Sequence, residues 1–134
     1  MLNLTKFAVN KAEGCPVATQ DIEKNLENRQ DASDKAAYGP LNPNEPNTDF
    51  WEKKAEKWDV SIEEAKKSRC GNCAVFIQTP KMMNCIREGL AAGDSMENAW
   101  DTARAGQLGY CESFDFKCAS KRTCDAWVVG GPVR

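Results

Sequence analysis

Cysteines supply most of the chemistry that this sequence could perform. Six of the seven cysteines lie between residues 70 and 124, and Cys70 and Cys73 form a C-x2-C pair. Closely spaced thiols bind metals, form disulfides or act as nucleophiles. Histidine is absent, which removes the usual general base, the Cys-His and Ser-His pairs and every zinc site that needs imidazole. We therefore assign no catalytic residues and expect the protein not to be an enzyme.

The spacing of the cysteines does not match two common thiol sites. A four-cysteine zinc ribbon normally has two C-x2-C pairs, and this chain has one. A thioredoxin-like site would follow a strand and begin a helix, whereas a helix is predicted before Cys70. One regularity does sort the thiols. An aromatic residue stands three positions after Cys73, Cys111 and Cys124, but not after Cys85 or Cys118.

That regularity defines a candidate ligand set of Cys70, Cys73, Cys111 and Cys124 and separates it from the other thiols. Four thiolates around an iron-sulfur cubane need protection from water, and aromatic neighbours would provide it. The expected shielding residues are Phe76, Tyr110, Phe114, Phe116 and Trp127. Ordinary core aromatics beside structural thiols would give the same pattern, so both interpretations stay open.

Two segments resemble a known family. The stretch "CGNCAVFIQ" is similar to the first ligand segment of the high-potential iron-sulfur proteins (HiPIPs), and "YCESF" with "CDAWVVGG" resembles their third and fourth. The resemblance implies one 4Fe-4S cluster on the four candidate cysteines, in a secreted electron carrier. This chain departs from the family in its 37 residues between Cys73 and Cys111, in lacking an export signal and in its 69-residue N-terminal extension.

The roles of Cys85, Cys118 and Cys15 have several possible interpretations. Cys85 and Cys118 would form a disulfide if their Cα atoms came within about 7 Å, would otherwise be free buried thiols, or one of them could replace an assigned ligand. Cys15 precedes Pro16 in an unpatterned segment and is expected to be a lone thiol.

The elements that must position these thiols are mostly helices. Helices are predicted over about 19–37 and 50–58, after Ser61, from Pro80 and over 95–105. At most short strands are expected, around 112–116 and 126–129. The expected fold is thus a small irregular α+β domain organised around a 4Fe-4S cluster, with short helices, few strands and an extended N-terminal arm.

The proline-rich connector at 38–47 suggests two parts: an N-terminal arm of residues 1–69 and a HiPIP-like cluster-binding domain of residues 70–134. The arm is expected to bind a protein partner or a larger assembly. The stretch "YGPLNPNEPNTDFW" leading into "CGNC" also resembles small uncharacterised proteins of tailed phages.

Composition limits location and partners. The net charge is −2 with mixed signs, so no basic stripe predicts nucleic-acid binding. No continuous apolar stretch predicts a secretory signal or a membrane span, so we expect a cytoplasmic or virion protein. In a reducing compartment clustered cysteines are more often metal ligands than disulfides.

Two functions follow. In the first, the cluster staples a small domain within a larger assembly, as in an accessory structural protein of a phage virion. The alternative is a soluble HiPIP-like one-electron carrier. Zinc is the alternative cofactor.

Overall fold

The computed structural model describes residues 14–90 and 107–134. Its helices are α2 (Val17–Gln20), α3 (Ile22–Ala36), α4 (Thr48–Trp58), α5 (Ile62–Lys67) and α6 (Pro80–Leu90), with a 3-10 turn η1 (Cys70–Asn72). Its strands are β1 (Phe76–Ile77), β2 (Leu108–Cys111) and β3 (Phe116–Ala119). A small mixed α/β fold of short elements is therefore confirmed. The helix expected over 95–105 lies outside the described residues.

Side-chain caps determine where several helices begin. Asp21 accepts hydrogen bonds from two backbone amides of α3, which separates α2 from α3 inside the single helix expected over 19–37. Ser61 caps α5 and Thr79 caps α6, as the sequence predicted. Helix α4 starts earlier than expected, after Asn47, so Asp49 lies in its first turn and is not its cap.

The three strands form one antiparallel sheet in the order β1-β2-β3. Residues 112–115, expected to be a strand, instead form the turn between β2 and β3. Asp115 has a φ of 56° there, a left-handed conformation that aspartate tolerates, and its N–H donates to the Cys111 carbonyl at 2.8 Å. The segment 126–129 contributes an isolated bridge between Val129 and Cys73 and is not a strand.

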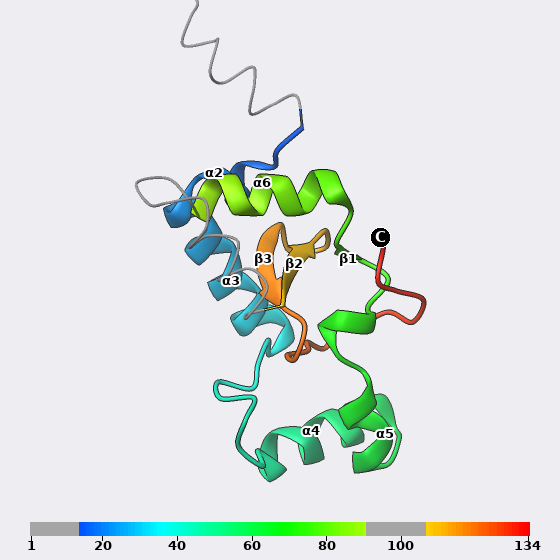
Figure 1. Cartoon of the computed structure of the whole chain (residues 1–134). Helices are drawn as coiled ribbons and strands as arrows, with labels where there is room; N and C mark the ends of the chain where they lie inside the picture. The colour runs from blue at the N-terminus through cyan, green and yellow to red at the C-terminus, as the bar shows by residue number, and fades with distance from the viewer. Residues whose placement is uncertain (1–13, 91–106) are drawn as a thin grey trace, which may run out of the picture.

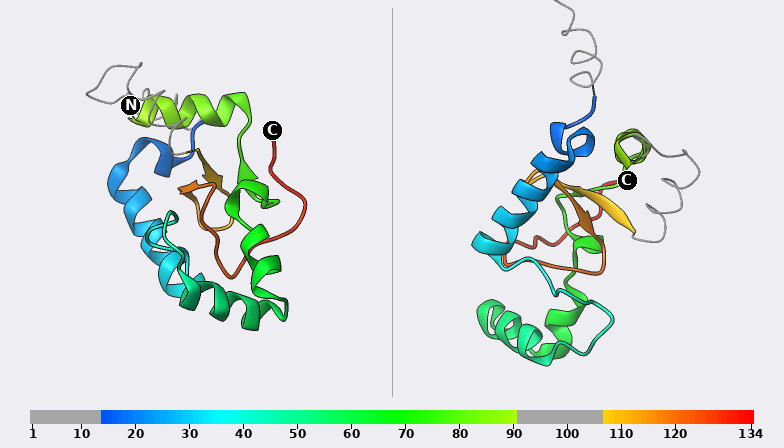
Figure 2. Two further views of the ribbon diagram at one scale, coloured as in Figure 1. Left: turned by 60° about the horizontal axis from the view of Figure 1, so that its bottom comes forward. Right: turned by 90° about the vertical axis from the view of Figure 1, so that its left-hand side faces the viewer.

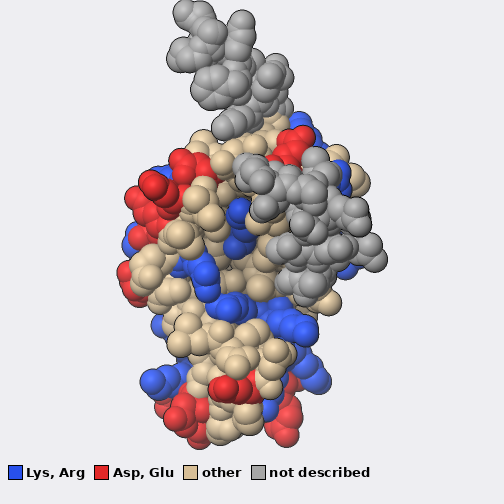
Figure 3. Space-filling view, turned by 60° about the vertical axis from the view of Figure 1, so that its left-hand side comes forward, with Lys and Arg blue, Asp and Glu red and all other residues tan. Residues whose placement is uncertain are grey.

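The helices surround the sheet on several sides (Figure 1). Helices α2 and α6 pack together at one end, α3 runs beside the sheet and contacts β3, and α4 and α5 pack together at the other end. The two further views in Figure 2 show the same arrangement. On the face in Figure 3, basic side chains gather across the middle, with acidic side chains above and below them.

The described part of the N-terminal segment is not an extended arm, which corrects that expectation. The Asn25 side chain accepts a hydrogen bond from the Lys117 N–H at 2.7 Å, and Gly39 exchanges two backbone hydrogen bonds with Thr123. Helix α3 and the connector that follows it therefore lie against the cysteine-bearing half. The domain boundary at 69/70 stays a prediction.

A disulfide joins Cys15 to Cys85 in α6, with their Cα atoms 5.3 Å apart. This corrects two expectations, because Cys15 is not a lone thiol and Cys85 does not pair with Cys118. The sequence could not show the pairing, since 70 positions separate the two residues and only the packing of α2 on α6 brings them together. Among the described helices, none is long and apolar enough to cross a membrane.

Candidate metal centre

Five cysteines line one cavity beside the sheet. They are the four candidate ligands Cys70, Cys73, Cys111 and Cys124, together with Cys118. The cavity has a volume of about 20 Å³, and its other described lining residues are mainly apolar. All five thiols are free, and all except Cys124 are fully buried. The structure thus brings the four predicted ligands together and adds a fifth thiol.

The sheet explains how two of these thiols face the cavity. Cys111 pairs with Phe116 and Gly109 pairs with Cys118, so these four residues lie on one face of β2 and β3. Gly109 is needed because a Cβ there would come within 2.5 Å of the Phe76 ring. The small residue leaves room for the tip of the Phe76 ring beside the strand that carries Cys111.

The C-x2-C pair is positioned by backbone contacts with segments distant in sequence. The Cys70 N–H donates to the Arg122 carbonyl at 2.6 Å, and the Gly71 N–H donates to the Ser120 carbonyl at 2.9 Å. On the other side, Gly131 lies so close to Cys73 that a Cβ at Gly131 would overlap the Cys73 carbonyl. The turn η1 is thereby held between the loop after β3 and the C-terminal segment.

Backbone amides point at the sulfurs of three predicted ligands. The Val128 N–H donates to Cys73 Sγ at 3.4 Å. A hydrogen bond from Cys118, and then backbone amides of Phe114 and Ser113, lower the pKa of Cys111 to about 7 against the opposing effect of its burial. Such donors favour the thiolate, which is the form that binds metals.

Burial is the largest influence on the pKa of Cys124 and of Cys118. It raises the pKa of Cys124 to about 12, although a backbone amide of Ala126 acts in the opposite direction. Burial also raises the pKa of Cys118, as do its hydrogen bonds to Cys111 and Cys70. Cys118 thus lies within hydrogen-bonding reach of two of the predicted ligands.

Four of the expected shielding aromatics lie near the thiols. Phe76 and Trp127 line the cavity, Phe116 is buried in the same cluster, and Phe114 packs against it. The Trp127 indole N–H donates to the Arg69 carbonyl and the Asn72 side chain, at 3.0 and 2.9 Å, which fixes the ring beside η1.

Tyr110 differs from the expectation. It precedes Cys111 in β2, so its side chain lies on the opposite face of the strand, where its hydroxyl contacts Asp115 at 3.3 Å. Tyr38, which the sequence did not single out, belongs to the cysteine cluster instead. Its ring meets Phe116 edge-on at 4.9 Å, and its hydroxyl accepts the Ala119 N–H at 3.0 Å.

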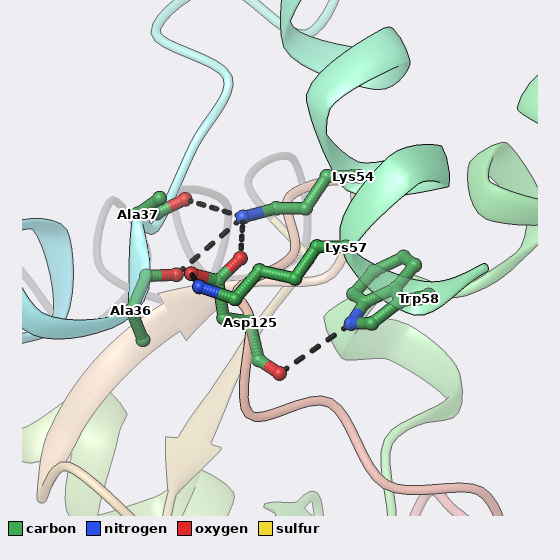
Figure 4. A network of polar contacts seen from close by, with 6 residues as sticks. All are labelled: Ala36, Ala37, Lys54, Lys57, Trp58 and Asp125. Carbon is green, nitrogen blue, oxygen red and sulfur yellow. Dashed lines mark hydrogen bonds and ion pairs between the residues drawn. The ribbon is translucent and has the colours of Figure 1, made fainter.

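A buried ion pair fixes the segment that carries Cys124 (Figure 4). Lys54 is only 3% exposed, and its ammonium group contacts Asp125, the residue after Cys124, at 2.5 Å. It also donates to the Ala37 carbonyl at the end of α3 at 3.1 Å. Lys57 adds a second, more exposed ion pair to Asp125 at 3.0 Å. A lysine within an amphipathic helix usually lies on its solvated face, so the sequence contained no signal for this burial.

Within residues 14–90 and 107–134, no three histidine, cysteine or acidic side chains are grouped so that they could hold a metal ion. Comparisons of the chain with protein-family models, curated proteins and solved structures found no match. The candidate centre therefore depends on the geometry of the thiols alone.

Proposed function

We propose that this chain binds one 4Fe-4S cluster through Cys70, Cys73, Cys111 and Cys124. The observation that carries the proposal is the convergence of these thiols, from η1, β2 and the C-terminal segment, on one mainly apolar cavity. An all-thiol donor set suits iron-sulfur clusters, and apolar walls with N–H groups aimed at sulfur are the features that stabilise and tune them.

The all-thiol donor set suits either a cluster or zinc. Four thiolates on one zinc ion lie about 2.3 Å from it, whereas a four-iron cluster spreads its ligands around a larger body. Zinc remains the outcome to be distinguished by metal analysis.

The cluster's first role in this proposal is to stabilise the fold. Its ligands come from segments up to 54 positions apart, and metal-binding free energy is folding free energy in small domains held together in this way. When bound, the cluster would also supply one-electron chemistry. The mainly apolar lining supports the second candidate function, a HiPIP-like electron carrier, because exclusion of water also stabilises a redox centre.

The structure does not support the main argument for a role in a larger assembly. That argument depended on an N-terminal segment that could not fold compactly, and the described part of that segment packs on the cysteine half. A place in a phage virion therefore stays a prediction from the resemblance alone.

The test is purification without oxygen followed by absorption spectroscopy and analysis of iron, sulfide and zinc. We expect a broad band at about 400 nm with about four irons and four sulfides per chain. One zinc and no colour would replace the cluster with a structural zinc site. Protein without metal would overturn the proposal.

Two matched variants test the ligand choice. Cys70→Ser removes a proposed ligand and should abolish iron binding, whereas Cys118→Ser changes another buried thiol in the same cavity and should retain it. Loss of iron in Cys118→Ser together with retention in Cys111→Ser would show that Cys118 is the ligand.

A further inference from the structure

A second hollow lies on the outer side of the cysteine turn. This cleft, of about 780 Å³, includes Gly71 and Asn72 of η1 and Ser120 in its lining. Gly71 is packed against Ser120, so that a Cβ at Gly71 would lie 3.0 Å from the Ser120 Cβ. Since Gly71 and Asn72 separate Cys70 from Cys73, the cleft and the cysteine cavity share the turn η1 as a wall.

The cleft is basic although the whole chain is slightly acidic. Its described lining includes Lys67, Arg69, Lys121 and Arg134 and no aspartate or glutamate. One of these cations counts for less, because Lys67 lies 3.7 Å from Glu64. The positive surplus therefore depends mainly on Arg69, Lys121 and Arg134.

Arg69 is held in place at the edge of the cleft. Its Nε donates to the Lys66 carbonyl at 2.7 Å and its Nη1 to the Lys121 carbonyl at 2.8 Å, and its guanidinium stacks on the Trp51 ring at 4.9 Å. A fixed guanidinium loses little conformational entropy on binding a carboxylate. Lys121, whose carbonyl accepts the hydrogen bond from Arg69, is exposed and lies beside it in the cleft.

We propose that this basic cleft is the docking site for a carboxylate-rich surface of a partner protein. The cleft is wide, polar and open, which suits a protein surface better than an enclosed small ligand. Complementary charge steers such encounters and sets their orientation. The assignment of this partner as the one that exchanges electrons rests on the proposed cluster, because docking there brings the partner against the turn that carries two of its ligands.

The test uses the full chain as purified without oxygen and a fluorescent hexaglutamate peptide as the probe. Binding is measured by anisotropy at low ionic strength, where charge interactions are least screened. Lys121→Gln with Arg134→Gln removes two exposed cations from the cleft, and Lys35→Gln with Lys53→Gln removes two exposed lysines from α3 and α4 as the matched control. We expect the first pair to weaken binding about fivefold and the control pair to leave it unchanged.

Three results would overturn the docking proposal. Equal weakening by both variant pairs would mean unspecific attraction, and no weakening by the cleft pair would mean that the peptide binds elsewhere. Inorganic phosphate that displaces the peptide at an equal concentration would mark a small-anion site. Iron is counted in the same samples, so that absence of iron contradicts the cluster, whereas iron without cleft-specific binding contradicts only the docking site.

Discussion

The contact between Lys54 and Asp125 gives a prediction whose size follows from burial. Asp125→Asn removes the negative charge opposite an ammonium group that is 3% exposed, that also donates to the Ala36 and Ala37 carbonyls and that lies over the Phe50 ring. Breaking a buried ion pair by removing one partner costs about 3–5 kcal/mol. Because Asp125 is itself 17% exposed and asparagine still accepts a hydrogen bond, we expect the lower end, about 3 kcal/mol.

The loss should be local, since the pair fastens the segment around Cys124 to α3 and α4. Hydrogen exchange of backbone amides measures such local opening without complete unfolding. The Thr123 N–H donates to the Gly39 carbonyl at 2.7 Å and reports on this segment. A loss of about 3 kcal/mol corresponds to roughly 100-fold faster exchange. The Met83 N–H in α6 donates to the Thr79 carbonyl and should keep its rate.

Lys57→Gln is the matched control because it removes the other cation on the same carboxylate. The Lys57 side chain is 61% exposed, and exposed pairs contribute about 0.5 kcal/mol, so exchange at Thr123 should rise only about twofold. An increase below fivefold in Asp125→Asn, or an equal increase in both variants, would refute the reasoning from burial.

Three further predictions follow from the same structure. Burial opposes the charged form of Asp125, but the hydrogen bonds from Lys54 and Lys57 hold its pKa below the usual value. The protection of the Thr123 amide that Asp125 supplies should therefore persist above about pH 4 and fade as the pH falls further. At that low pH, the exchange rates of wild type and Asp125→Asn should converge. Replacing Cys15 and Cys85 by alanine should lower the free energy of unfolding by up to about 4 kcal/mol, measured in guanidinium chloride, because the bond closes a loop of 70 positions; no change would contradict the disulfide. Tyr38→Phe should lower the free energy of unfolding by about 1 kcal/mol in the same assay, because the hydrogen bond from the Ala119 N–H of β3 to the Tyr38 hydroxyl is lost. An unchanged free energy would contradict a stabilising role for this hydrogen bond.

Local signals in the sequence predicted the starts of α5 and α6, because a cap needs only one side chain and the next three amides. The same signals did not predict the strands correctly. The turn at 112–115 lies where a strand was expected, and Asp115 adopts a left-handed conformation there. Strand registers depend on a partner strand, and the partner of β2 was not visible along the chain.

For the candidate site, too, some residues were predicted from the sequence and others were not. The cysteine and aromatic spacing indicated Cys70, Cys73, Cys111 and Cys124 before any fold was known, because ligand type and flanking residues are local properties. Only the tertiary structure decided that Cys118 shares their cavity, that Tyr38 rather than Tyr110 joins the cluster and that Cys15 pairs with Cys85. Burial and pairing between distant segments depend on which faces of the helices and strands meet, and that is determined by the packing of the whole chain.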